Sequence, residues 1–134
     1  MRKASNVIFL VSAIVSIVAV IGLLITSLVF LAFTTPEAKE EIIKALQDGR
    51  MTTSVPGTLN EQADAIQAIF KAFGIIFLFA SVFGVANTVI CFVARKKHTT
   101  GVLVLSIVFG VLSFVEINIL ASIFGFVANA RQEE

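Results

Sequence analysis

The stretch VIFLVSAIVSIVAVIGLLITSLVFLAF, residues 7–33, contains no charged side chain. About 20 consecutive apolar residues are enough to cross the hydrocarbon core of a bilayer, so this stretch predicts a transmembrane helix. Residues 72–94 are also uncharged, and residues 99–130 carry a single charge, Glu116. The pattern predicts an all-α integral membrane protein, a bundle of three long transmembrane helices at about residues 6–33, 67–94 and 101–129.

Composition supports a membrane protein and excludes two other classes. The chain has 134 residues, of which 57% are hydrophobic and 14% are charged. Soluble domains carry charge on about a quarter of their residues, so a water-facing globule is excluded. The net charge of +1 argues against nucleic acid, because phosphate binding needs a concentrated basic face. The apolar core of the first run is far longer than the roughly 7–15 residues of a signal peptide, so we expect a retained first span.

A polar segment, residues 34–66, separates the first two runs and contains two helix starts. Thr34-Thr35-Pro36-Glu37 combines a hydroxyl cap with an early proline, and Gly49 is a typical stop, so a short amphipathic helix is predicted between them. Thr58-Leu59-Asn60-Glu61 is a second capping box. We expect its helix to continue without a break into the second span.

The third run allows two interpretations. It could break near residues 115–118 into two halves, which would give a re-entrant or four-span arrangement. Each half would be short for an independent span, and a re-entrant hairpin needs its backbone covered by protein. No glycine or proline occurs at residues 113–118. One continuous helix is therefore the prediction.

Basic residues indicate the orientation. The N-terminus and the link after the second run hold five of the ten Lys and Arg residues, and the remaining five are scattered. Arg95, Lys96 and Lys97 are adjacent on a tight link, where they act most strongly as a topology signal and can also meet lipid headgroups. This predicts a multi-pass protein of the plasma membrane with a cytoplasmic N-terminus and residues 34–66 outside the cytoplasm. Three spans would place the C-terminus outside as well.

The polar residues that we single out within the apolar runs are Glu116, Asn118 and Asn87. Ionisable residues inside a membrane are costly and recur in ion pathways, whereas amides commonly hydrogen-bond between helices. We expect these three to form an intramembrane polar contact or an ion site, and Glu116 to bond to another helix or to a partner. A contact role is favoured, because a proton relay usually needs more than one ionisable station.

Small residues recur at helical spacing in every run. Such stripes let helix backbones approach closely when lipid removes the hydrophobic driving force between helices. The residues predicted to form the packing faces are Ser12, Ser16, Gly22, Gly74, Gly84, Gly110 and Gly125.

The last third of the chain, GVLVLSIVFGVLSFVEINILASIFGFVANAR (residues 101–131), follows the basic link ARKKH (residues 94–98). It resembles small multi-pass membrane protein families of unknown function in Gram-positive bacteria. Their final segments are often Gly-, Leu- and Ile-rich runs that follow a lysine cluster and end in a basic residue. The resemblance implies four spans in many members and transfers no catalytic residue.

The sequence contains no nucleophile beside a base, no phosphate-binding glycine loop and no metal-ligand set, so we expect neither catalysis nor a cofactor. It predicts a non-enzymatic protein that contacts the lipid bilayer and another membrane protein or its own copies. An accessory, regulatory or immunity-type subunit fits this pattern. The alternative is a self-assembling pore or ion-conducting oligomer that uses Glu116.

Overall fold

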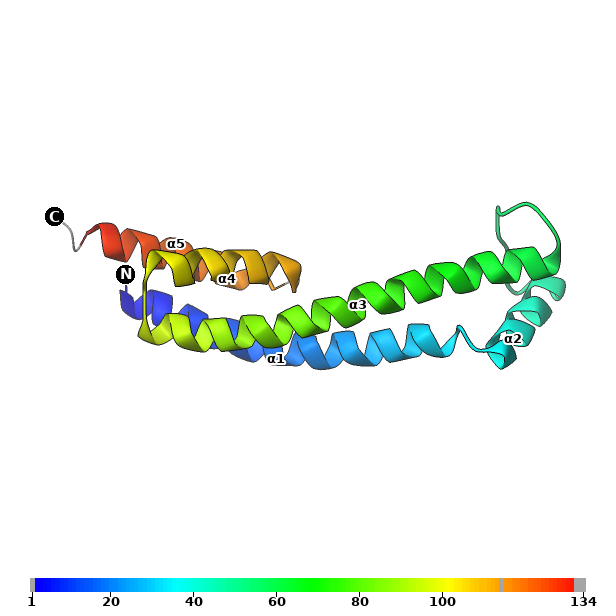
Figure 1. The fold of residues 1–134 in the computed structure, drawn as a ribbon, viewed down its shortest axis with the longest axis horizontal. Coiled ribbons are helices and arrows are strands. Elements are labelled where there is room, and N and C mark those ends of the chain that lie inside the picture. The colour runs from blue at the N-terminus through cyan, green and yellow to red at the C-terminus, as the bar shows by residue number, and fades with distance from the viewer. Residues whose placement is uncertain (1, 114, 132–134) are drawn as a thin grey trace. The chain divides into compact units, whose positions relative to one another are not determined.

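The computed structural model describes residues 2–113 and 115–131, and those residues form helices and connecting turns. The helices are α1 (Arg2–Ala32), α2 (Pro36–Gln47), α3 (Leu59–Lys96), α4 (Thr100–Leu112) and α5 (Ile117–Ala130) (Figure 1). The predicted all-α class is confirmed.

Among the described residues, two helices are long and apolar enough to cross a membrane, α1 with 31 residues and α3 with 38. Only 28% of the most apolar stretch of each is buried inside the protein. The core helix of a soluble protein is mostly buried, so this exposure separates both helices from that class.

The amphipathic helix and both helix starts are confirmed. The Thr35 hydroxyl accepts the Ala38 N–H at 3.3 Å, and Gly49 follows the helix end with φ of 70°. At the start of α3 the capping box is reciprocal: Glu61 N–H donates to the Thr58 hydroxyl, and Thr58 N–H donates to the Glu61 carboxylate at 2.8 Å. The helix then runs unbroken to Lys96, as predicted.

The prediction of one continuous third helix is wrong, because the run breaks after Leu112 and α5 begins at Ile117. The absence of glycine and proline misled the prediction: Ser113 and Glu116 both keep negative φ, −98° and −80°, so neither residue needs left-handed backbone. The Ser113 hydroxyl also donates to the Phe109 carbonyl at 2.6 Å, a back-bond of the kind that slightly destabilises and bends helices. At 1.5 Å per residue, α4 and α5 are each about 20 Å long.

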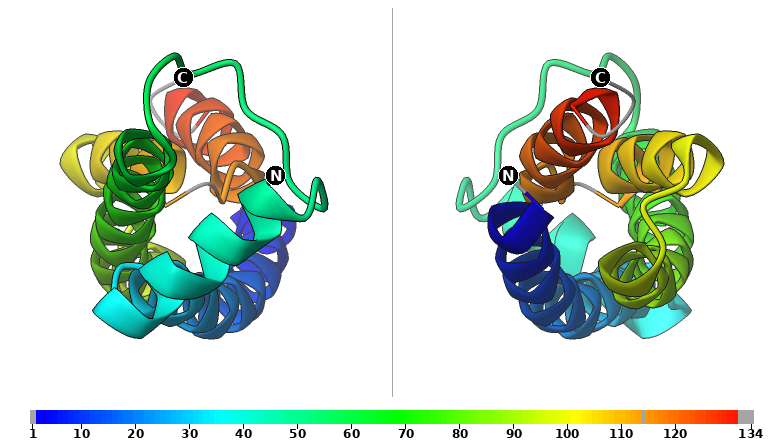
Figure 2. Two further views of the ribbon diagram at one scale, coloured as in Figure 1. Left: turned by 90° about the vertical axis from the view of Figure 1, so that its right-hand side faces the viewer. Right: turned by 90° about the vertical axis from the view of Figure 1, so that its left-hand side faces the viewer.

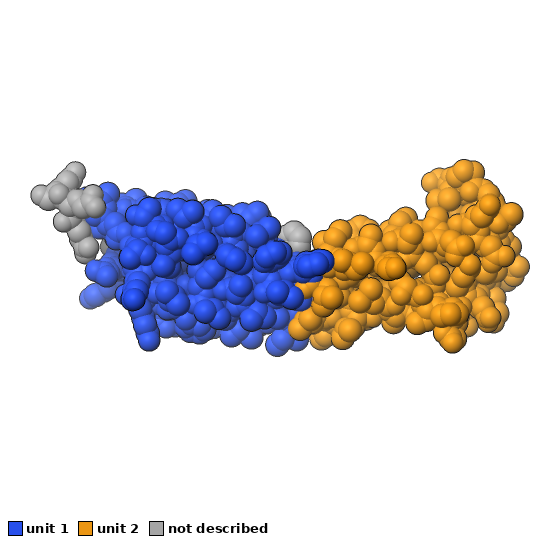
Figure 3. All heavy atoms as spheres, viewed as in Figure 1, with its two compact units in different colours: residues 1–23, 79–134 blue, residues 24–78 orange. Residues whose placement is uncertain are grey.

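The chain divides into two compact units, coloured separately in Figure 3. Unit 1 comprises residues 1–23 and 79–134, and unit 2 comprises residues 24–78. In unit 1 the start of α1, the end of α3, α4 and α5 lie side by side (Figure 2, right). Its buried apolar cluster draws on all of these segments and consists of Phe9, Ala13, Cys91, Ala94, Leu103 and Ala121.

Unit 2 contains the end of α1, the whole of α2 and the start of α3. The Ser27 hydroxyl donates to the Gly74 carbonyl at 2.7 Å. The Phe30 ring of α1 lies 5.6 Å from the ring of Phe70 and 5.7 Å from that of Phe77, both on α3. These contacts account for the α1–α3 packing in this unit.

Candidate functional site

Two asparagine side chains form a buried amide chain across unit 1. The Asn87 amide donates to the Ser16 hydroxyl at 2.9 Å, and its oxygen accepts from the Asn118 amide at 2.8 Å. Asn118 also donates to the Ser106 carbonyl. This series of hydrogen bonds therefore joins α1, α3, α5 and α4. It brings together Asn87 and Asn118, two of the three predicted polar residues.

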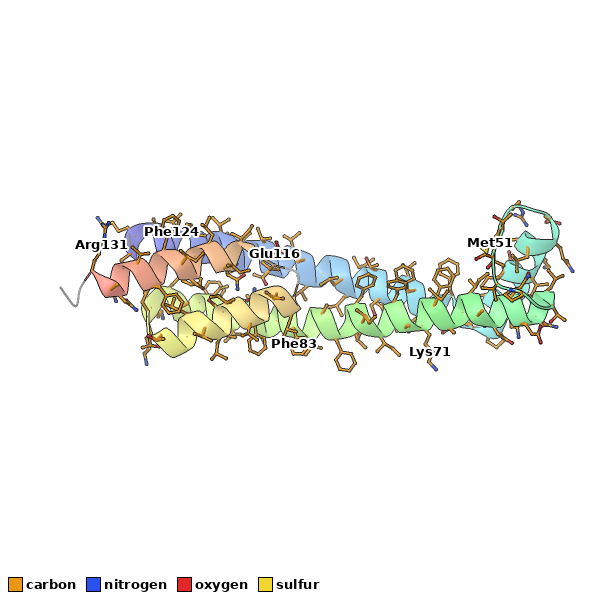
Figure 4. The ribbon with its side chains drawn as sticks, turned by 90° about the horizontal axis from the view of Figure 1, so that it is seen from above. Met51, Lys71, Phe83, Glu116, Phe124 and Arg131 are labelled. Carbon is orange, nitrogen blue, oxygen red and sulfur yellow. The ribbon has the colours of Figure 1, made fainter. Side chains whose placement is uncertain are left out.

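The third predicted residue, Glu116, does not lie inside a helix. It is exposed in the turn that precedes α5, where Figure 4 labels it. We expected this carboxylate to bond to another helix or to a partner, and that contact stays a prediction. The break instead aims Asn118, two positions later, into the bundle, where it has no exposed surface.

The α4–α5 hairpin closes along a seam of small residues. From the turn outward, Gly110 faces Asn118, the Ser106 hydroxyl contacts the Ser122 hydroxyl, and the Gly125 position faces Leu103. A Cβ at Gly125 would lie 2.8 Å from Leu103, and one at Gly110 would overlap the Asn118 amide. Glycine at both positions leaves the room that the Asn118 and Leu103 side chains occupy.

The other predicted packing residues divide into two groups. Ser12, Ser16, Gly74 and Gly84 all lie at α1–α3 contacts: a Cβ at Gly74 would lie 2.8 Å from Leu31, and the Cys91 thiol lies 3.6 Å from the Ser12 hydroxyl. Gly22 differs from these four: it is exposed, and a Cβ there would meet no atom within 4 Å, so its packing role stays a prediction.

A second polar group lies at the end of unit 1 that contains the α3–α4 link. The His98 Nε2 is 3.2 Å from the Ser5 hydroxyl, and Ser5 donates to the Ala121 carbonyl at 2.9 Å. Phe9 packs edge-on to the imidazole. Burial, together with the positive charge of Arg2, lowers the pKa of His98 below its ordinary range. Asn129 of α5 donates to the His98 carbonyl, so the end of α5 lies beside this link.

Of the predicted basic residues, Lys96 and Lys97 are exposed and Arg95 is half-buried. Sequence reasoning missed the roles of Ser5, Ser106, Ser122 and His98. A sequence signal was present for Ser106 and Ser122. Ser106 and Gly110 before the turn are four residues apart, as are Asn118 and Ser122 after it. This symmetric spacing predicts a contact only when a turn between the two pairs is already known.

No family model, no curated protein and no solved structure matches this chain. The resemblance to families of Gram-positive bacteria stays a prediction. Among the described residues, no group of three His, Cys, Asp or Glu side chains could hold a metal ion.

Proposed function

We propose that this chain is a non-enzymatic integral membrane protein that binds another membrane protein through the tip of the α4–α5 hairpin. An accessory, regulatory or immunity-type subunit would use such a contact. The observation that supports it is the position of Glu116, exposed at the hairpin turn and close in level to Val20, the middle residue of the uncharged run 7–33.

The depth of the turn follows from contacts within unit 1. A Cβ at Gly84 would lie 3.8 Å from the Ser113 Cβ and 2.5 Å from the Val20 side chain, so the turn is level with both residues. Val20 lies midway along the uncharged run 7–33. If α1 crosses a bilayer about 30 Å thick, the hairpin turn lies near its centre.

Lipid tails cannot hydrogen-bond to the carboxylate and backbone groups of a turn at that depth. A mid-bilayer carboxylate costs about 2.5–3.5 kcal/mol or more, and the unpaired backbone groups at helix ends add to this cost. Non-helical backbone at membrane depth is tolerated where protein covers it or water reaches it. A partner helix that presents a hydrogen-bond donor to Glu116 would provide that cover.

The hairpin also strengthens the argument for the proposed membrane orientation, because it changes how the basic residues divide between the two sides. In the three-helix prediction the basic residues divided five against five, with Arg131 on the outer side. Because α5 returns to the α3–α4 link, Arg131 joins Arg2, Lys3 and the three basic residues of that link, which gives six of the ten at one end of unit 1. The positive-inside rule then favours a cytoplasmic N-terminus and C-terminus, with residues 34–66 outside.

A contact surface outside the membrane would lie under α2. An apolar pocket of ≈ 550 Å³ in unit 2 is lined by Val29 of α1, Phe33 just after α1 and Ile42 of α2, with Glu41 and Arg50 among its other lining residues. An apolar side chain of a partner, flanked by a polar group, fits this lining.

Photo-crosslinking tests the hairpin contact. A photoreactive residue at Ile117, exposed beside Glu116, should yield an adduct with a different membrane protein when activated in the host membrane. The same residue at Val18, exposed on α1, serves as the control and should react with lipid. Glu116→Gln should weaken the complex by roughly 10- to 100-fold, which corresponds to one charge-assisted hydrogen bond, whereas Glu40→Gln on α2 should leave it intact. Lipid adducts alone at Ile117 would refute the proposal.

The same exposed carboxylate supports a second candidate, an ion-conducting oligomer. Copies of the chain around a shared axis could place Glu116 side chains in a ring facing water. Ile117 adducts would then join two copies of this chain, and Glu116→Gln would change cation flux in liposomes. Absence of flux from the purified wild-type chain would exclude this candidate.

A further inference from the structure

A polar pocket at the α3–α4 link is not used by the proposed partner contact. Its volume is ≈ 470 Å³, and all the residues that line it belong to unit 1: Arg2, Lys96, Lys97, His98, Thr99, Thr100 and Asn129. Three of these carry a positive charge and, of the described residues that line it, none is acidic. The pocket therefore favours an anion.

The first turn of α4 adds donors to this pocket. The first N–H groups of an α-helix have no partner within the helix, and they carry the positive end of its dipole. Thr99 stands at the N-cap but makes no side-chain capping bond, so its hydroxyl does not occupy these donors. A Cβ at Gly101 would meet nothing within 4 Å, which leaves the backbone of this turn open to a ligand. Phosphate groups bind at helix N-termini of this kind.

His98 provides independent evidence for a ligand. Its side chain is only 6% exposed, yet the buried Nδ1 has no hydrogen-bond partner among the described residues. Ser5 gives its single hydroxyl proton to the Ala121 carbonyl, so at 3.2 Å it accepts from His98 Nε2–H. That bond fixes the ring and leaves Nδ1 of the neutral imidazole as an unpaired buried acceptor on a residue that lines the pocket. Buried polar atoms are generally paired, so an unpaired one calls for a partner.

We propose that this pocket binds a phosphate group, held by Arg2, Lys97, the first turn of α4 and His98. In the neutral ring Nδ1 would accept from a protonated phosphate or a headgroup hydroxyl, and in the protonated ring Nδ1–H would donate to a phosphate oxygen; Nε2–H stays on Ser5 in both. The phosphate can belong to a phospholipid headgroup or to a free phosphorylated solute. An adjoining groove of ≈ 560 Å³ shares Lys96 with the pocket, and its apolar residues Val89, Phe92 and Val93 of α3 are placed to contact an acyl chain. That groove favours phospholipid as the source.

The test compares two double variants that remove the same charge. Arg2→Gln/Lys97→Gln removes two cations from the pocket, whereas Lys3→Gln/Arg131→Gln removes two cations that do not line it. The purified full chain is placed in nanodiscs of phosphatidylcholine with increasing phosphatidylglycerol, and lipid retention is measured by native mass spectrometry. At about 1 kcal/mol per cation, the pocket variant should bind phosphatidylglycerol about 30-fold more weakly than wild type, and the control should change by less than about threefold.

Two further experiments identify the molecule that carries the phosphate and control for misfolding of the double variants. In neutral detergent without lipid, inorganic phosphate and glycerol phosphate are titrated onto the wild-type chain. Binding of phosphatidylglycerol alone identifies a lipid site, and comparable binding of glycerol phosphate identifies a solute site. Thr99→Val keeps every charge and should weaken binding severalfold through loss of the hydroxyl. Equal losses in both double variants, or no preference for phosphatidylglycerol over phosphatidylcholine and no phosphate binding, would overturn the proposal.

Discussion

Replacing Asn118 by alanine removes the side chain that joins α5 to both α3 and α4. Two hydrogen bonds between helices are lost, one to Asn87 and one to the Ser106 carbonyl. Such bonds contribute about 0.6 kcal/mol each on average inside membrane proteins. The Asn87 oxygen is also left buried without this donor, which costs a further 1–3 kcal/mol, roughly. Asn118→Ala should therefore destabilise unit 1 by about 2–4 kcal/mol.

The chain contains its own probe for this measurement. Cys91, its single cysteine, lies fully buried in unit 1, so alkylation requires local opening. When closing is faster than alkylation, the rate reports the opening equilibrium, and 2–4 kcal/mol corresponds to a rate about 30- to 900-fold higher. Asn60→Ala, at an exposed asparagine of unit 2, is the control and should leave the rate within about twofold of wild type.

A double-mutant cycle isolates the contact itself. Asn87→Ala alone should raise the alkylation rate of Cys91, and the double variant should lose about 1 kcal/mol less than the sum of the two single losses, because the shared bond is counted once. Strict additivity would show that the Asn87–Asn118 bond contributes nothing. A loss below about 0.5 kcal/mol for Asn118→Ala would refute the amide chain as a source of stability.

Two more predictions follow from the same unit. Gly110→Ala should destabilise unit 1 by about 1–3 kcal/mol because its Cβ would overlap the bonded Asn118 amide. Gly101→Ala, with open space around the new Cβ, should be neutral or stabilise by up to about 1 kcal/mol. The Cys91 alkylation rate distinguishes the two variants, and equal effects would contradict close packing between Gly110 and Asn118. His98 has a lowered pKa in the folded chain, so the unfolded chain takes up the proton first, and stability in neutral detergent should fall as the pH drops below about 6.5. His98→Gln should flatten that dependence, and an unchanged pH profile would show that the imidazole does not titrate between the two states.

The sequence by itself determined the solvent that the helices suit and most of the local structure. The uncharged runs fixed α1 and α3 because a helix satisfies its own backbone, and side-chain hydroxyls with a glutamate three residues on fixed the starts of α2 and α3. These signals act over a few neighbouring residues. They need no knowledge of what each helix contacts.

Only the tertiary structure decided how the third run is used. A continuous helix and a broken one satisfy local preferences almost equally, since Ser113 and Glu116 keep ordinary backbone angles in the break. The break is favoured by contacts distant in sequence, above all the Asn118 amide on Asn87 and the serines meeting across the hairpin. Those contacts exist only after the chain has folded back. For the same reason, sequence could place Glu116 in an apolar run but not at the exposed tip of a turn.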